Sequence, residues 1–178
     1  MRWAVHGERA IYESEWVRLC LADVEVPGHG RFEHHVVRVP RKAAGTILRD
    51  SERGVLLLWR HRFITDTWGF EIPAGRVEAD EAPAEAALRE TIEETGWRPL
   101  GLQPLFSYQP TNGLSDQKFH LFLSDGAEYV GEPTDTAEAE RLEWVSIPRL
   151  AEIAKSGQML DGLSLTTVLY ALAFGYLA

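Results

Sequence analysis

The sequence predicts an α+β protein, and three observations support this fold class. Segments rich in strand-forming residues dominate the first part of the chain, whereas segments with helical periodicity lie in the middle and at the end. Hydrophobic residues make up 45% of the 178 residues and charged residues 25%, which is typical of a globular domain. A chain of this length is expected to form one domain with a small appended element.

Several short segments have the composition of β-strands. Strand formers concentrate in residues 16–26, 31–39, 45–49, 54–60, 68–73, 100–108, 118–124 and 141–147. The turn sequences PGHG and DSERG separate the first two pairs of these segments, so each pair predicts a hairpin. Pro73 ends the strand at residues 68–73, because proline has no N–H to donate to a sheet.

Helices are expected at about residues 82–95, 148–156 and 163–174. In the first of them, a period of about 100° per residue assigns the buried side to Ala84, Leu88, Thr91, Ile92 and Thr95. Glu90, Glu93 and Glu94 fall on the opposite side, which is expected to face solvent. Gly96 follows directly, and glycine favours the left-handed turn that ends a helix.

The charge and cysteine content exclude several classes of protein. Eighteen basic and 27 acidic residues give a net charge of −9, which disfavours non-specific binding to nucleic acid or to anionic membranes. The single cysteine, Cys20, rules out an internal disulfide and fits a reducing compartment. There is no apolar run long enough to span a bilayer, and the first residues lack the apolar core of a secretory signal. A cytoplasmic protein is expected.

The three helical glutamates require an explanation, because like charges three and four residues apart repel each other on a helix. They form either a solvated acidic surface or a site for a hard divalent cation such as Mg²⁺, which takes oxygen ligands. Arg89 lies four residues after Glu85 and four before Glu93, so it could pair with either. Helix geometry alone does not choose between the two interpretations.

The residues around the helix favour the metal site. Residues 75–97 read GRVEADEAPAEAALRETIEETGW, which resembles the Nudix box. The fixed positions of that motif are all matched, by Gly75, Glu81, Arg89, Glu90, Glu93, Glu94 and Gly96. With residue frequencies near ~7%, a chance match at a given start is on the order of 10⁻⁸. Thr91 stands where the motif usually has an aliphatic residue, which is a change in packing and leaves the carboxylates untouched.

This resemblance implies an α/β/α sandwich with a mixed sheet, the Nudix fold. It also implies hydrolysis of a nucleoside diphosphate linked to another moiety, with Mg²⁺ or Mn²⁺ as cofactor. The box glutamates that ligate metal would be Glu90 and Glu94, usually with Glu93, while Arg89 would orient a box glutamate. A chain of charge −9 that binds an anionic substrate needs such a counter-charge.

The sequence before the box resembles the ADP-ribose and nucleotide-sugar pyrophosphatase branch of this family. Residues 70–75, FEIPAG, match its E-[IL]-P-A-G run, which implies that the Ala74 carbonyl ligates metal and that Glu71 lies near the substrate. Arg62, in LLLWRHRF, aligns with an arginine of the branch that contacts substrate or phosphate. Because Arg60 and Arg62 alternate on one strand face, Arg62 could equally be a surface charge.

Two later segments supply further candidates by the same resemblance. Pro110 lies in FSYQPTNGLSDQKFHLF, which resembles a substrate-contacting segment of the branch, although such a stretch is also typical of a long hairpin loop. The general base of the branch is a glutamate on the loop before the last strand. Glu138 and Glu140 are the candidates here, with Glu143 assigned to the strand, unless metal alone activates the water.

The expected organisation is an N-terminal β-rich dimerisation region at residues 1–40 and a Nudix hydrolase domain at residues 41–178. The first region resembles the part that dimerises ADP-ribose pyrophosphatases, so a homodimer is expected. The predicted activity is metal-dependent hydrolysis of ADP-ribose or another nucleotide sugar to a nucleoside monophosphate and a sugar phosphate. The alternatives are a dinucleotide or nucleoside triphosphate substrate, or a non-catalytic nucleotide sensor. Such sensors tend to lose box carboxylates, and this chain keeps them.

Overall fold

The computed structural model describes residues 1–136 and 139–177. The chain forms two compact units. The N-terminal unit comprises Met1–Lys42 together with Gln109–Lys118, and the main unit contains the other described residues. The candidate base Glu138 lies outside the described residues.

The N-terminal unit is a three-stranded antiparallel sheet of order β1-β2-β3. Its strands are β1 (Ala4–Glu13), β2 (Arg18–Val26) and β3 (Gly30–Arg38). The hairpin expected around PGHG is therefore confirmed, whereas β1 was not expected from the sequence. Every residue of β1 is exposed, so the strand lacks the strict alternation of apolar and polar residues that marks a half-buried strand. The loop at residues 109–118 joins β3 through the hydrogen bond from Val37 N to Leu114 O, at 2.8 Å.

The main unit is built on a mixed sheet of order β12-β5-β4-β10-β9, in which β6 pairs with β5 and β7 with β4. Its strands are β4 (Ala43–Asp50), β5 (Gly54–Arg62), β6 (Thr67–Glu71), β7 (Ala74–Arg76), β9 (Gln103–Tyr108), β10 (Phe119–Asp125) and β12 (Arg141–Val145). Only β10 and β4 pair in parallel among the described strands. A separate ribbon joins β8 (Trp97–Pro99) to β11 (Ala127–Tyr129). The mixed sheet expected from the sequence is confirmed.

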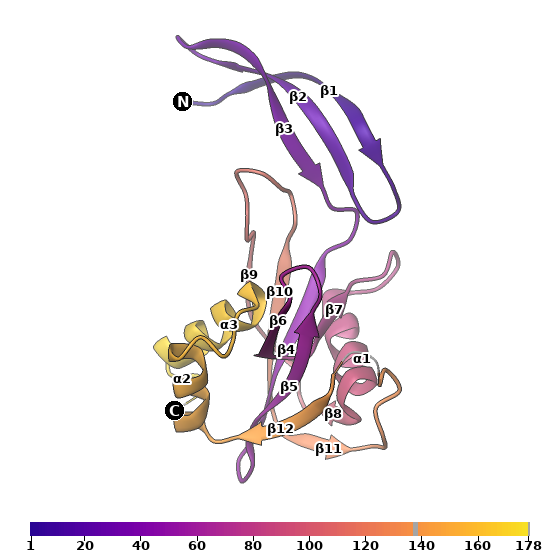
Figure 1. Cartoon of the computed structure of the whole chain (residues 1–178), viewed down its shortest axis with the longest axis vertical. Coiled ribbons are helices and arrows are strands. Elements are labelled where there is room, and N and C mark those ends of the chain that lie inside the picture. Colours follow the sequence, from indigo (N-terminus) through magenta and orange to yellow (C-terminus); the bar gives the residue numbers. More distant parts are fainter. Residues whose placement is uncertain (137–138, 178) are drawn as a thin grey trace. The chain divides into compact units, whose positions relative to one another are not determined.

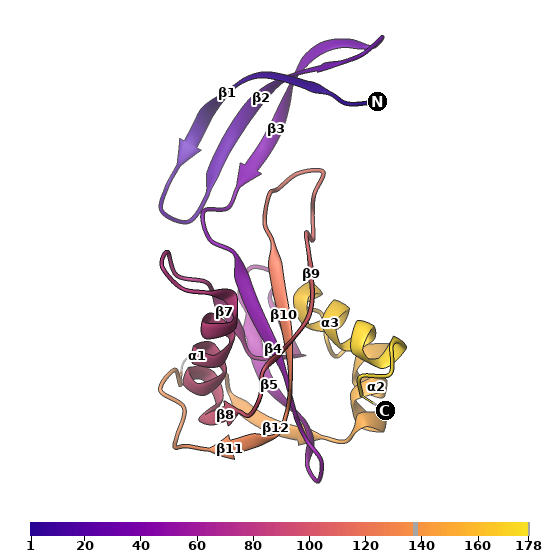
Figure 2. The same ribbon diagram turned by 180° about the vertical axis from the view of Figure 1, so that it is seen from behind.

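Helices cover both faces of this sheet, as Figures 1 and 2 show. Helix α1 (Pro83–Thr95) packs on one face, while α2 (Ile147–Lys155) and α3 (Gly162–Ala173) pack on the other. The three helices lie within about two residues of where the sequence predicts them. The arrangement is an α/β/α sandwich, so the predicted fold class is confirmed.

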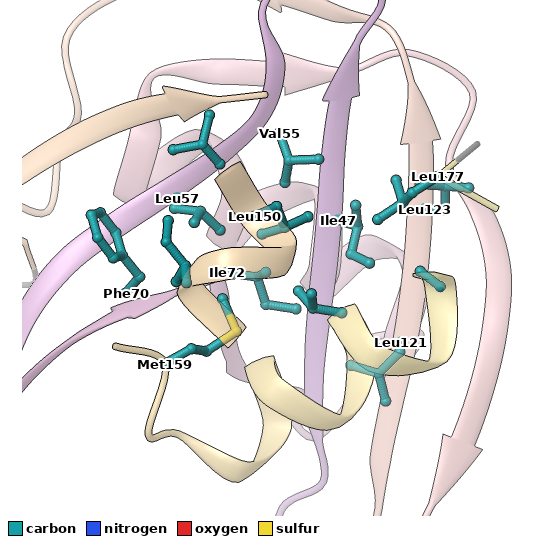
Figure 3. Close-up of a cluster of buried hydrophobic side chains, with 14 of the residues drawn as sticks. Ile47, Val55, Leu57, Phe70, Ile72, Leu121, Leu123, Leu150, Met159 and Leu177 are labelled. Carbon is teal, nitrogen blue, oxygen red and sulfur yellow. The ribbon is translucent and has the colours of Figure 1, made fainter. Parts of the chain in front are cut away.

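The strands of the sheet divide the core into two clusters because successive side chains point to opposite faces. On the side of α2 and α3, Ile47 and Leu121 join a large cluster with Leu150 and Met159 (Figure 3). On the side of α1, Phe122 packs in a smaller cluster with the alanines of the helix. Each fully buried side chain of this size stabilises the fold by about 1.5–3 kcal/mol.

The buried face of α1 differs from the expected one. Ala84 is exposed, whereas Ala86 and Ala87 are buried and Glu94 is only 4% exposed. The helical period alone placed Glu94 opposite the expected buried side, and it does not show partners from other segments. The partners come from β5 and from the start of β7, which the helical pattern does not contain. Gly96 has φ of 72° and ends the helix as predicted.

Candidate active site

The carboxylate of Glu90 lies directly against Gly75, the first residue of the motif, which explains why this position is a glycine. A Cβ atom on Gly75 would lie 2.0 Å from Cδ of Glu90 and 2.2 Å from both of its carboxylate oxygens. No side chain fits at that distance, so Gly75 lets strand β7 approach the glutamate of α1. The burial of Glu90 raises the pKa of its carboxyl above the ordinary value.

Glu94 is the most buried carboxylate of the motif. Its Oε2 accepts a hydrogen bond from the backbone N of Ala74 at 2.9 Å, and its Oε1 accepts one from Nη1 of Arg60 at 3.3 Å. Loss of solvation raises the pKa of Glu94 to about 7, against the opposing effects of the Ala74 N–H and of Arg60. A buried carboxylate of this kind gains strongly from a nearby positive charge.

Arg89 organises the remaining carboxylates. Its Nε and Nη2 donate to the two oxygens of Glu81 at 2.9 and 3.0 Å, and its Nη1 donates to Glu90 at 2.8 Å and to Glu93 at 3.0 Å. Nη2 also donates to the carbonyl of Arg76 at 2.9 Å. These bonds, first of all those to Glu81, raise the pKa of Arg89, so the guanidinium stays charged.

The spacing of α1 left two partners open for Arg89, and the structure selects one of them. Arg89 pairs with Glu93, while the carboxylate of Glu85 accepts a hydrogen bond from Ala82 N at 2.9 Å and caps the helix. The planar guanidinium thus holds three glutamates together. This fixes the positions of Glu90 and Glu93, whose side chains are 17% and 43% exposed.

A second ion-paired group extends the site along β5 and β6. Nε and Nη2 of Arg62 donate to the two oxygens of Glu71, at 2.8 and 2.5 Å, and Glu71 is only 4% exposed. Oε2 of Glu71 lies 4.0 Å from Nε of Arg60, which in turn bonds Glu94. A continuous chain of charges therefore runs from Arg62 to Glu94. The side chain of Arg62 is 49% exposed, whereas its partner Glu71 is buried.

A cavity of about 590 Å³ adjoins the pair formed by Arg62 and Glu71. The hairpin between β5 and β6 forms one wall, and the segment Leu160–Gly162 before α3 forms the other. Its size falls within the usual range for sites that bind small molecules, about 300–1,000 Å³. The cavity lies wholly within the main unit.

The loop expected to carry the general base is fastened to the end of α1. The backbone N–H groups of Thr134 and Asp135 both donate to the carbonyl of Glu93, at 2.9 and 3.0 Å. A Cβ atom on Gly96 would lie 1.9 Å from the carbonyl oxygen of Gly131, so the last glycine of the motif permits this contact. Glu140 is exposed, and its N–H donates to Trp59 O at 2.9 Å.

The structure places the other predicted site residues as follows. Ala74 at the start of β7 lies next to the C-terminal half of α1, which carries Glu90, Glu93 and Glu94. Pro110 belongs to the loop of the N-terminal unit, so the main unit does not contain it. Sequence reasoning gave no site role to Arg60, although its alternation with Arg62 along β5 was visible. Residues two positions apart lie on the same face of a strand, so Arg60 could have been considered as a site residue together with Arg62.

The residues present suit a hard dication in their chemistry. Carboxylates and a backbone carbonyl are the oxygen donors that Mg²⁺ and Mn²⁺ prefer. Within residues 1–136 and 139–177, however, the acidic, histidine and cysteine side chains do not gather in threes closely enough to hold a metal ion as they stand. The guanidinium groups of Arg60 and Arg89 lie among the carboxylates instead. Metal binding therefore requires these arginines to share or release their partners.

Across the described part of the chain, the helices are too short or too polar to cross a membrane.

Comparison with known proteins gives a consistent result. Residues 39–161 match the family model of the NUDIX domain. The chain is 41% identical over 175 residues to a CMP-5′-(N-acetyl-N-hydroxy-3-aminopropyl)phosphonate hydrolase of Streptomyces rubellomurinus, with 98% of this chain and 84% of the relative covered. It is 26% identical to an ADP-ribose pyrophosphatase of Bacillus subtilis, with 79% and 76% covered. The crystal structure of an ADP compounds hydrolase superposes with a TM-score of 0.86 at 13% identity, covering 98% and 94% of the two chains.

Proposed function

This chain belongs to the NUDIX family as a pyrophosphohydrolase of nucleotide derivatives, and from that premise we propose that it hydrolyses ADP-ribose or another nucleotide sugar. The products would be a nucleoside monophosphate and a sugar phosphate. The observation that carries the proposal is Glu94, a buried carboxylate bonded to Ala74 N at 2.9 Å within a complete set of motif residues. The FEIPAG run that contains Ala74 is the feature shared with the ADP-ribose branch.

The identity of 41% over nearly the whole chain favours a second substrate class. The relative's name describes a cytidine monophosphate joined to a phosphonate, and that compound shares with a nucleotide sugar the anhydride bond between two phosphorus atoms. The catalytic requirement is the same in both cases. What differs is the group beyond the second phosphorus atom.

Divalent cations, Mg²⁺ or Mn²⁺, would be held by Glu90, Glu93, Glu94 and the carbonyl of Ala74. When bound, such cations neutralise the negative charge of a diphosphate and make an attacking water more acidic. The chain itself contributes by holding the metal-binding carboxylates in position. Arg89 fixes the orientation of Glu90 and Glu93 through its Nη1, so that these carboxylates are preorganised before substrate arrives.

Two further residues complete the proposed mechanism. Arg62 would bind a phosphate of the substrate, with Glu71 fixing the direction of its guanidinium. A glutamate of the loop before β12, Glu138 or Glu140, would take the proton from the attacking water. Glu140 follows a loop whose earlier part is bonded to Glu93 O, which supports a role for this loop near the carboxylates of α1.

A panel of substrates with product identification tests this proposal. The full-length protein would be incubated with Mg²⁺ and ADP-ribose, ADP-glucose, GDP-mannose, a CMP-phosphonate and nucleoside triphosphates. Metal-dependent release of a nucleoside monophosphate from a nucleotide sugar is the expected result. Release from the CMP-phosphonate alone would select the second substrate class, and release of pyrophosphate from triphosphates would overturn both. Binding without hydrolysis would indicate the non-catalytic sensor.

A homodimer in the cytoplasm is also proposed. The N-terminal unit exposes several large apolar side chains, which are Trp3, Val5, Ile11, Tyr12, Trp16 and Phe32. Several exposed apolar side chains in one small unit are typical of an interaction surface. Sedimentation at micromolar concentration should give twice the mass of one chain, and a monomer would remove this part of the proposal. The acidic chain with its single cysteine supports the cytoplasmic location.

A further inference from the structure

The cavity beside Arg62 and Glu71 is also lined by a charged residue, Asp161, that has no role in the proposed mechanism. Asp161 lines this cavity together with the hairpin of β5 and β6. Its carboxylate also begins helix α3, because Oδ2 accepts hydrogen bonds from Ser164 N at 2.8 Å and from Ser164 Oγ at 2.7 Å. Within the described part of the chain, both hydrogen bonds that the carboxylate of Asp161 accepts end on Oδ2. The second oxygen, Oδ1, is therefore available to a ligand.

The balance of charge in the cavity excludes a second anionic group. Arg62 and Glu71 neutralise each other through two hydrogen bonds. Asp161 is the further charged residue that lines the cavity, and its negative charge acts on Arg62. A group with hydrogen-bond donors suits such a wall, whereas a phosphate or carboxylate beside Asp161 is repelled.

The remaining lining residues suit a ring with hydroxyl or amino groups. Thr65 and Thr67 bring hydroxyl groups whose oxygens lie 2.7 Å apart. Ile64 and Leu160 supply apolar surface at the cavity, and they are 83% and 56% exposed. Aliphatic side chains of this kind pack against the flat or apolar face of a nucleobase or sugar. The hydroxyl groups of Thr65 and Thr67 and the carboxylate of Asp161 can then form hydrogen bonds with the polar edge of that nucleobase or sugar.

The position of the cavity relates it to the diphosphate. Oε2 of Glu71, in the cavity wall, lies 4.0 Å from Nε of Arg60, and Nη1 of Arg60 lies 3.3 Å from Oε1 of Glu94. In the proposed function, cations at Glu94 and the guanidinium of Arg62 hold the phosphates, which brings the group attached to them to the mouth of the cavity.

We propose that this cavity binds the uncharged group attached to the diphosphate, and that Oδ1 of Asp161 accepts a hydrogen bond from an amino or hydroxyl group on it. Asp161 is then a specificity-determining residue. This inference rests on the proposed function, because it takes the diphosphate to lie at the carboxylates of α1. The same donor chemistry is found in the amino group of cytosine or adenine and in the hydroxyl groups of a sugar.

Pairs of substrates that differ in one donor group test the inference. CDP-glucose and UDP-glucose differ at the base amino group, as do ADP-ribose and IDP-ribose, and 2″-deoxy-ADP-ribose lacks one sugar hydroxyl. The wild type should favour the member with the donor by about tenfold or more in KM in at least one pair, because hydrogen bonds to a charged group are stronger than those between neutral groups. The pair that responds identifies the base or the sugar as the bound group.

Asp161→Asn and Asp161→Ser should bring that KM ratio close to one while leaving kcat nearly unchanged. Asparagine and serine begin helices as well as aspartate does, so Tm should stay near the wild-type value. Asp66→Asn is the matched control, because Asp66 lies in the turn between β5 and β6, does not line the cavity and is almost fully exposed.

The possible outcomes separate the inference from its premise. If the ratios of Asp161→Asn and Asp161→Ser equal those of the wild type in every pair, the inference is overturned. An equal loss of discrimination in Asp66→Asn overturns it too, because the effect then does not come from the cavity. Absence of hydrolysis of all these substrates by the wild type removes the proposed function, and the inference falls with it.

Discussion

Arg60 and Glu94 form a buried ion pair between β5 and α1, with Nη1 3.3 Å from Oε1. The two residues are 9% and 4% exposed. Arg60 occupies an oxygen of the carboxylate that the proposed mechanism assigns to metal. Metal binding and this ion pair therefore compete for the same atom.

Replacing Arg60 by glutamine should destabilise the metal-free protein and strengthen its response to metal. Removing one partner of a buried ion pair costs about 3–5 kcal/mol, because the remaining charge stays buried. Thermal melts at pH 8 should show a lower Tm without metal, and a larger rise of Tm with Mg²⁺ than in the wild type. Arg98→Gln, at an exposed position, should resemble the wild type. Equal rises of Tm with Mg²⁺ in wild type and Arg60→Gln would show that Mg²⁺ and the guanidinium of Arg60 do not compete for Glu94.

The stability of the metal-free protein should depend on pH through Glu94. The pKa of Glu94 is about 7 in the folded protein and 4.5 as the ordinary value. The folded state therefore holds the proton more tightly than the unfolded state does. This contribution to stability is fully present below pH 4.5 and is lost as the pH rises through about 7.

Denaturant titrations in EDTA at several pH values check this prediction. The free energy of unfolding of the wild type should fall between pH 4.5 and about 7 relative to that of Glu94→Gln, which has no carboxyl to titrate. Parallel curves for the two proteins would contradict the assignment. Glu94→Gln should in addition abolish hydrolysis.

Gly75→Ala should disable the site while leaving the fold intact. The added Cβ would lie 2.0 Å from Cδ of Glu90, so the glutamate must leave its position. We expect a loss of about a hundredfold or more in kcat/KM together with weaker Mn²⁺ binding in calorimetry. Gly7→Ala is the matched control, because nothing lies within 4 Å of the added atom there. A Gly75→Ala protein with normal Mn²⁺ affinity would show that Glu90 does not bind metal.

Glu138→Gln and Glu140→Gln should distinguish the two candidate bases. General-base assistance contributes about 10²–10⁴ to the rate, so one variant should lose that factor in kcat and the other should not. The two loop glutamates are not among the carboxylates proposed to bind metal. The affinity for Mn²⁺ should therefore stay unchanged in both variants. Full activity in both variants would leave the activation of water to the metal alone.

The sequence predicted the architecture of the main unit. The motif from Gly75 to Gly96 placed helix α1 and its ending glycine correctly, but the helical spacing left Glu85 and Glu93 as alternative partners of Arg89 and missed Glu81, to which Nε and Nη2 donate. Spacing failed where partners come from distant segments. Glu94 is buried by Arg60 and by the backbone of Ala74, which a helical pattern does not contain. The availability of Asp161 to a ligand depends on which of its oxygens begins α3, and only the structure shows that.

The attachment of the loop before β12 to helix α1 has an evolutionary consequence. Thr134 and Asp135 reach Glu93 through backbone atoms alone, so these bonds survive almost any replacement of the two side chains. Selection is then free to move an acidic residue from one place to another along the following stretch without disturbing the helix. Descendants of a common ancestor can in this way acquire different proton acceptors while inheriting one set of cation ligands.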